Sequence, residues 1–265
     1  MQPRAQVLLN TPDIELWPGG LLRGRANRDA RILARAAWVL RRKRDGRYLA
    51  AEVPEGLVSL VPSLAREPGI EAALDALARH GPRPRSGPGG ATLPLSGLEA
   101  RLEALGLDVD GYAGRTGLGL VPEPVQLRLA GIDRFRRPLW LEDGAARAWA
   151  RLSHAARRDG IVLEAISGYR SHDYQLGIFE RKRARGLCVD EILAVNAAPG
   201  FSEHHSGRAL DIGTPGEPPA EESFESTDAF AWLQGNAAHD GFAMSYPRDN
   251  AHGIDYEPWH WRFGG

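Results

Sequence analysis

The sequence predicts an α+β fold in which helices flank an antiparallel sheet. Apolar residues recur at helical spacing in several segments, and short β-type runs lie between them. Two such runs stand close together near the C-terminus, as antiparallel neighbours do. The pattern becomes more regular at about residue 117, so we expect a smaller N-terminal α+β domain, residues 1–116, followed by a second α+β domain, residues 117–265.

A β-hairpin is the first element predicted in the N-terminal domain, over residues 34–53. Two apolar runs flank Asp45-Gly46, which is a strong turn signal. A basic run, residues 41–44, precedes this turn. We interpret these charges as solvated at the hairpin tip.

A helix is predicted next, over residues 69–80, with Ile70, Leu74 and Leu77 on its apolar face. Two further segments complete this domain: a Pro- and Gly-rich linker or long loop at 82–90 and a short helix at 97–106. None of these elements carries a motif that indicates the role of the domain.

Helices and strands are interspersed in the second domain. We expect helices at 143–159, at 171–185 and around 230–233, and strands at 161–166, 208–212, 242–246 and 256–263. Two helices have clear apolar faces, which we predict to be buried: Trp149, Leu152 and Ala156 in the first, and Tyr174, Ile178 and Phe179 in the second.

The composition, 43% hydrophobic and 25% charged residues, is ordinary for a globular protein. A formal net charge of −1 gives no electrostatic reason to expect nucleic acid as a partner. We find neither the apolar core of a signal peptide nor a run long enough for a transmembrane segment, and expect a soluble chain. The one cysteine, Cys188, excludes an intrachain disulfide, and its apolar neighbours predict that it is buried.

Two short segments combine the residue types of a catalytic metal site. His204 and Asp211 lie where a predicted loop leads into a strand, so both can reach one ion. Glu257 and His260 follow near the C-terminus, where Pro258 indicates a turn or bulge that would bring both to the same place. Two imidazoles and one carboxylate leave a position open for water, and a second carboxylate is available as a base. The pattern predicts a metal-dependent hydrolase.

Together with residues 167–171 (Ser-Gly-Tyr-Arg-Ser), these segments resemble the motifs of VanY-type D-alanyl-D-alanine carboxypeptidases, zinc peptidases related to the VanX dipeptidases. The other matching motifs are Ser202-x-His204-x-x-Gly207-x-Ala209-x-Asp211 and Glu257-Pro258-Trp259-His260-Trp261-Arg262. The resemblance covers about residues 120–265. It implies one zinc ion held by His204, Asp211 and His260. It also implies Glu257 as the general base for a zinc-bound water, and Arg170 as the group that stabilises the oxyanion or holds the substrate.

The resemblance extends to three further substrate contacts. Gln175 and Ser202 would hydrogen-bond to the substrate, and Tyr246 would line the cleft. The neighbouring His205 is expected to point away from the ion, because adjacent residues of an extended chain face opposite ways. Ser245 is a departure, since many relatives carry a basic residue there. This difference weakens the carry-over of substrate detail but not that of the metal site.

The activity implied by the resemblance is removal of the terminal D-Ala from peptidoglycan stem peptides. The motifs indicate amide hydrolysis without specifying the bond, so an L,D-carboxypeptidase, a D-Ala-D-Ala dipeptidase and a wall endopeptidase stay open. This substrate class points to the cell envelope or periplasm, while a cytoplasmic location and the oligomeric state stay open.

Two other classes of protein fit the residues less well. A non-haem iron oxygenase also uses two histidines and a carboxylate, but its first histidine and carboxylate lie closer together in sequence than His204 and Asp211. A non-catalytic wall-binding module would not need Glu257 and Arg170, and both are present.

Overall fold

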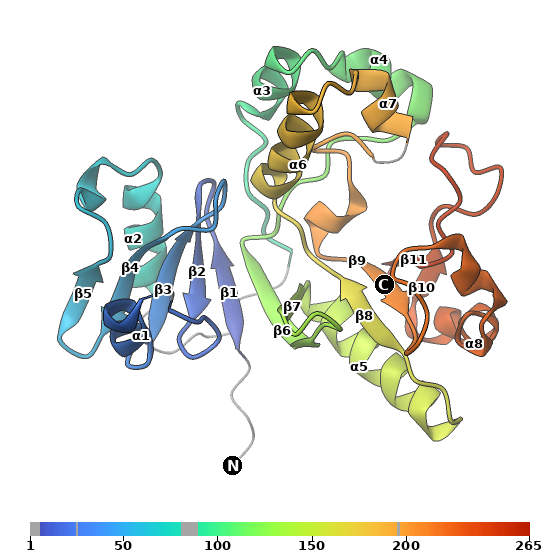
Figure 1. Cartoon of the computed structure of the whole chain (residues 1–265), viewed down its shortest axis with the longest axis horizontal. Helices are drawn as coiled ribbons and strands as arrows, with labels where there is room; N and C mark the ends of the chain where they lie inside the picture. The colour runs from blue at the N-terminus through green and yellow to red at the C-terminus, as the bar shows by residue number, and fades with distance from the viewer. Residues whose placement is uncertain (1–5, 25, 81–89, 195–196) are drawn as a thin grey trace. The chain divides into compact units, whose positions relative to one another are not determined.

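The structure, a computed structural model, describes residues 6–24, 26–80, 90–194 and 197–265. Its contacts group the chain into two compact units (Figure 1). Unit 1 comprises Met1–Pro94 and Pro124–Leu129, and unit 2 comprises Leu95–Glu123 and Ala130–Gly265. Each unit combines helices with antiparallel strands, which confirms the predicted α+β class. The predicted division into domains 1–116 and 117–265 stays a prediction.

Unit 1 is an antiparallel sheet with helices, in the strand order β5-β4-β3-β2-β1-β6. Its elements are β1 (Val7–Asn10), β2 (Ile14–Pro18), α1 (Asn27–Leu33), β3 (Trp38–Arg42), β4 (Tyr48–Val53), β5 (Gly56–Ser59), η1 (Leu64–Arg66), α2 (Ile70–His80) and the first residues of β6 (Gln126–Ile132). Trp38 and Leu40 of β3 pack with Ile70 and Leu77 of α2 in one apolar core. Leu74, predicted on the same helix face, is 36% exposed instead.

Strands β3 and β4 confirm the predicted hairpin, with a turn spanning residues 43–47. The basic run before the turn is not simply solvated. Arg42 is buried and bonds to Asp45 and Glu67 at 2.6 Å each, and these two carboxylates raise the pKa of its guanidinium. Most of the predicted linker at 82–90 lies outside the described residues.

Unit 2 contains a four-stranded antiparallel sheet in the order β10-β11-β9-β8. Its strands are β7 (Pro138–Leu141), β8 (Glu164–Ser167), β9 (Ala209–Gly213), β10 (Phe242–Met244) and β11 (His260–Phe263), of which β7 neighbours β6. Its helices are α3 (Leu98–Ala104), α4 (Val109–Thr116), α5 (Asp143–Arg158), α6 (His172–Ala184), α7 (Val189–Ala194) and α8 (Asp228–Asn236), with the short turns η2 (Glu203–Ser206), η3 (Glu222–Ser226) and η4 (Ala237–Asp240).

Two apolar cores stabilise unit 2. The first joins α5 and α8 to the sheet, and it contains Trp149, Leu152 and Ala156 as predicted. The second joins α3, α4, α6 and α7, which Figure 1 shows grouped at one end of the unit, around Phe201 and Leu176. The candidate site residues described below come from β9, β11, η2 and α6 and from the loops that flank these elements.

Two predictions about burial in this unit are wrong. Tyr174 is 46% exposed, because Leu176 and Phe179 form the buried face of α6. Cys188 is exposed, because it precedes α7 and its backbone N–H donates to the Glu191 carboxylate at 2.7 Å, as at a helix start. Among the described residues, no helix is both long enough and apolar enough to cross a membrane.

Candidate active site

Backbone pairing brings two of the predicted metal ligands together. His260, the first residue of β11, is the Cα partner of Asp211 in β9, the strand next to it in the sheet. On the other side of β9, Asp211 pairs with Ser167 at the end of β8, where the register shifts by a bulge. Paired residues of antiparallel strands project their side chains to the same face. The sheet therefore sets both position and direction of these two groups.

His204 reaches the same place from the short turn η2, which is followed by Gly207 with a backbone φ of 67°. This left-handed conformation suits glycine and turns the chain directly into β9. The Nδ1 atom of His204 donates to the carbonyl of Gly168 at 2.7 Å. A neutral ring with its proton on Nδ1 has a free lone pair on Nε2. That Nε2 atom is buried without a hydrogen bond among the described residues.

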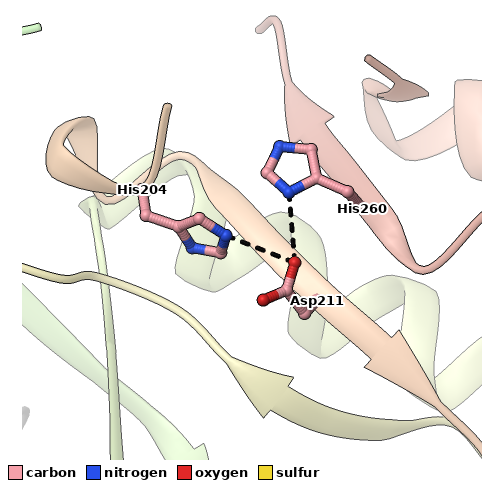
Figure 2. Close-up of side chains that lie close together, drawn as sticks. All are labelled: His204, Asp211 and His260. Atoms are coloured by element: carbon pink, nitrogen blue, oxygen red, sulfur yellow. Dashed lines mark hydrogen bonds and ion pairs between the residues drawn. The ribbon is translucent and has the colours of Figure 1, made fainter. Parts of the chain in front are cut away.

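The two histidine rings converge on one carboxylate oxygen of Asp211, as Figure 2 shows. Oδ1 of Asp211 lies 3.2 Å from Nε2 of His204 and 3.1 Å from Nδ1 of His260. The potential ligand atoms all lie within 4.8 Å of one another, and all three residues are buried. Two ring nitrogens that face one carboxylate away from water form a site that fits a cation such as zinc. The geometry thus brings the predicted ligand set together.

Burial and neighbouring charges shift the pKa values of the two histidines in opposite directions. Burial and the nearby Arg170 lower the pKa of His204 to about 4, so this ring is neutral at pH 7. Burial alone would also lower the pKa of His260, but its hydrogen bonds to Asp211 and Glu203 raise it to about 9. Burial would raise the pKa of Asp211, yet the two histidines and Arg170 hold it well below its usual value. His260 must therefore lose a proton before it can bind a cation.

Glu257 lies beside the cluster because the predicted turn at Pro258 is present. The backbone N–H of His260 donates to the Glu257 carbonyl at 3.1 Å, and that of Glu257 donates to the Tyr246 carbonyl at 3.1 Å. Oε2 of Glu257 is 3.7 Å from Nδ1 of His260. Burial raises the pKa of Glu257 to about 7, while His260 opposes this rise and Asp211 adds to it. A carboxylate with such a pKa can exchange protons near neutrality.

Arg170 lies in the loop between β8 and α6. The loop approaches its neighbours closely at Gly168, where an added Cβ would stand 2.9 Å from the Trp140 carbonyl oxygen. It ends at Ser171, whose hydroxyl caps α6 by accepting from the Tyr174 N–H at 3.1 Å. Arg170 lies between Gly168 and Ser171 in this loop, and its Nη2 atom is 3.3 Å from Oδ2 of Asp211. The guanidinium thus stands at the edge of the proposed metal site.

All the predicted site residues except Asp211, which lies against both histidines, line one pocket. Gln175 is buried in α6; its Nε2 donates to the Ala197 carbonyl at 3.1 Å, and its Oε1 makes no hydrogen bond within the described part of the chain. The Tyr246 ring lies 4.8 Å from that of His260. Ser202 is buried at the start of η2. The structure therefore places the three proposed substrate contacts beside the metal cluster, and their roles stay predictions.

Glu203 and His205, the two residues next to the proposed ligand His204, were not singled out from the sequence as functional. Glu203 accepts from His260 at 3.0 Å and from the Ser245 hydroxyl at 2.6 Å. His205 is fully buried in η2, which is a 3-10 turn rather than the extended chain expected there, and both of its ring nitrogens bond to backbone groups. Its Nδ1 donates to the Arg170 carbonyl at 2.7 Å, and its Nε2 accepts from the Gly200 N–H at 3.1 Å. The only signal in the sequence was their adjacency to His204.

A buried His-Asp-His cluster, with a proton-exchanging carboxylate and an arginine beside it, has the composition of a metallohydrolase site. Residues 138–265 match the sequence profile of the VanY family, D-alanyl-D-alanine carboxypeptidase. VanXYC of Enterococcus gallinarum, a bifunctional D-Ala-D-Ala dipeptidase and D-Ala-D-Ala carboxypeptidase, is 30% identical over 149 residues, which are 54% of this chain and 76% of VanXYC. The chain belongs to the VanY family, a family of peptidases.

Other relatives are similar over about half of the chain. The putative carboxypeptidase YodJ of Bacillus subtilis is 37% identical over 129 residues, which are 48% of this chain and 47% of YodJ. The chain thus spans about half the length of this relative. The solved structure of the LdcB LD-carboxypeptidase has 34% sequence identity and a TM-score of 0.48, over 51% of this chain and 65% of that one.

Proposed function

We propose that this protein is a zinc-dependent carboxypeptidase that removes the terminal D-Ala from peptidoglycan stem peptides. The convergence of His204, Asp211 and His260 beside Glu257 and Arg170 carries the proposal, because these are the groups that amide hydrolysis at a metal requires. Membership of the VanY family supports the peptide substrate. We assign the activity to residues 117–265 and leave the role of residues 1–116 open.

One zinc ion would be held by Nε2 of His204, a carboxylate oxygen of Asp211 and Nδ1 of His260. Nitrogen and oxygen donors of this kind suit zinc, and three protein ligands leave a position open for water or substrate. When bound, zinc would supply a Lewis acid that makes water more acidic and polarises the scissile carbonyl.

Glu257 would act as the general base. Its Oε2 atom lies on the Nδ1 side of His260, next to the proposed ion, and is in a position to take a proton from the attacking water. The same carboxyl group would then donate that proton to the amine that leaves as D-Ala. A pKa of about 7 supports both roles, because the group can accept and return a proton near neutral pH.

Arg170 would stabilise the negative charge that develops on the carbonyl oxygen, or hold the substrate carboxylate. Its guanidinium stays charged at any physiological pH, and its buried Nε atom makes no hydrogen bond to the described residues. Gln175, Ser202 and Tyr246 would contact the peptide from the other walls of the pocket. The buried Oε1 atom of Gln175 would accept a substrate N–H.

Turnover of a purified muropeptide pentapeptide by the zinc-loaded protein tests the proposal, with products identified by mass spectrometry. We expect loss of one D-Ala, abolished by a chelator and restored by zinc. A D-Ala-D-Ala dipeptidase is the second candidate, because the relative VanXYC is bifunctional; free D-Ala-D-Ala as substrate tests it. Cleavage of a tetrapeptide instead would indicate an L,D-carboxypeptidase. No cleavage by a protein that binds zinc would overturn the proposed activity.

A further inference from the structure

Glu203 is a half-buried carboxylate that the proposed reaction does not use. It precedes His204 in η2, and its side chain is only 13% exposed. Its Oε2 atom accepts from Nε2 of His260 at 3.0 Å and from the Ser245 hydroxyl at 2.6 Å, while its Oε1 atom lies 3.5 Å from Nη1 of Arg262. Two of these partners, His260 and Arg262, lie in β11 and the third, Ser245, follows β10, so Glu203 connects η2 to both segments.

The contact with Glu203 determines which nitrogen of His260 can bind a metal. Nε2 faces Glu203, whereas Nδ1 faces Asp211 at 3.1 Å. An ionised carboxylate can only accept a hydrogen bond, so the ring must keep its proton on Nε2. When His260 is neutral, its lone pair is therefore on Nδ1 and points toward Asp211. The carboxylate thereby selects the tautomer that the site needs.

The tautomer of His204 is held by a weaker, uncharged hydrogen-bond acceptor. Its Nδ1 atom donates to the uncharged carbonyl of Gly168, and its Nε2 atom faces Asp211. The two rings thus present opposite nitrogens to one oxygen, each held from behind by its own acceptor. A charged acceptor makes the ring a stronger donor to a metal than a neutral one does. His260 should therefore be the stronger of the two histidine ligands.

We propose that Glu203 is a positioning residue that holds His260 as an Nδ1 ligand and strengthens metal binding through its charge. The inference depends on the proposed metal site, and it concerns affinity rather than chemistry. Ser245 donates to the same Oε2 atom as His260 and holds the Glu203 side chain in this orientation. Its hydroxyl therefore supports the orientation of the carboxylate but adds no charge to the site.

The test is the zinc affinity of purified protein, measured by competition with a chromophoric chelator in the wild type and in Glu203→Gln, Glu203→Ala and Ser245→Ala. Loss of a group that supports a metal ligand from behind commonly costs about 10–100-fold in affinity. We expect a loss in this range for Glu203→Ala, a loss near its lower end for Glu203→Gln, and a smaller one for Ser245→Ala. Glu142→Gln is the matched control. The Glu142 carboxylate caps α5 by accepting from the Gly144 N–H at 2.9 Å, so the zinc affinity of this variant should equal that of the wild type.

If the alanine variant fails to fold, Glu203→Gln still tests the effect of the Glu203 charge on zinc affinity, because glutamine keeps the volume and the acceptor oxygen but removes the charge. A zinc affinity within about threefold of wild type in Glu203→Gln would overturn the proposed role of the charge. A wild-type protein that binds no zinc would instead overturn the metal site on which this inference depends. Long-range ¹H–¹⁵N correlations of the His260 ring in metal-free protein above pH 9, where the ring is neutral, give a second readout: they should report the proton on Nε2 in the wild type and a mixture of tautomers in Glu203→Ala.

Discussion

Asp211 and His260 are directly opposed residues of β9 and β11, so backbone pairing rather than a loop sets the distance between two proposed metal ligands. A shift of one residue in this pairing would turn His260 to the opposite face of the sheet. The third ligand, His204, is held from behind by the Gly168 carbonyl. Two ligands on paired strands and one anchored ring form a site that is organised before a cation arrives.

Replacing Glu257 by Gln should abolish most of the turnover while zinc stays bound. Glutamine keeps the size of the side chain but cannot take a proton, and general-base catalysis commonly contributes about 10²–10⁴-fold to the rate. Steady-state kinetics with a muropeptide, together with zinc content by atomic absorption, check this. Glu180→Gln, on the exposed face of α6, is the control and should turn over normally. Unchanged turnover in Glu257→Gln would exclude this residue as the base.

Replacing Arg170 by Lys should lower kcat by about 10²–10³-fold, which is the usual cost of losing one group that stabilises an oxyanion. The ammonium group keeps the charge but loses the planar fork that reaches toward Asp211 and into the pocket. Zinc content should not change, because the three ligands are intact. Arg147→Lys on the surface of α5 serves as the control. A kcat equal to that of the wild type would assign Arg170 a structural role only.

Zinc binding should release about one proton per ion at pH 8. His260 is protonated there, because its pKa is about 9 in the metal-free site, whereas His204 and Glu257 are already deprotonated. The affinity for zinc should accordingly rise with pH up to about 9 and then level off. Calorimetry in buffers of different ionisation enthalpy measures the release directly. An enthalpy that does not depend on the buffer would contradict the prediction.

The same shifts make the stability of the metal-free protein depend on pH. The ordinary pKa values are 6.5 for His260 and 4.5 for Glu257, and both are raised in the folded state. Each group therefore stabilises the fold fully below its ordinary pKa and loses that contribution as the pH rises through about 7 for Glu257 and about 9 for His260. The urea midpoint of the metal-free protein should therefore fall between about pH 7 and pH 9. Zinc-loaded protein should not show the fall, since binding strengthens with pH; equal profiles for both forms would count against the assignment.

Replacing His205 by Ala should destabilise unit 2 and lower turnover. The ring is fully buried, and its removal leaves a cavity together with an unpaired Arg170 carbonyl and Gly200 N–H. We expect a loss of about 3 kcal/mol in the free energy of unfolding, measured by urea denaturation. His239→Ala, at an exposed position in η4, is the matched control. A stability equal to the control would show that the loop before α6 is held by other contacts.

Much of the proposed site was predictable because its residues belong to compact motifs. The turn at Pro258 and the strand after His204 followed from local patterns, and the structure contains both. Glu203 could not be singled out, because its partners His260 and Ser245 are distant in sequence and meet it only after the sheet has formed. Short-range patterns do not encode such pairs.

The fold was predicted more completely in unit 2 than in unit 1. Amphipathic α5 has strong periodicity and the expected buried face, whereas β1, β2 and β5 are four or five residues long and gave no distinct signal. Helix α4 lies in a Gly-rich stretch and depends on the Asp108 cap, which accepts from the Gly111 N–H at 2.9 Å. On α6, contacts with α3 and α7 bury Leu176 and leave Tyr174 exposed, which the residue types alone do not indicate.

The strand order β10-β11-β9-β8 places the last strand of the sequence inside the sheet rather than at its edge. A chain cut between residues 214 and 256 keeps His204 and Asp211 but lacks Glu257 and His260, and its β9 has an open edge. Such a fragment cannot assemble the hydrolytic groups from what remains. Under the proposed function, hydrolysis therefore requires that β11 is present in the sheet, and a chain that stops before Glu257 is inactive.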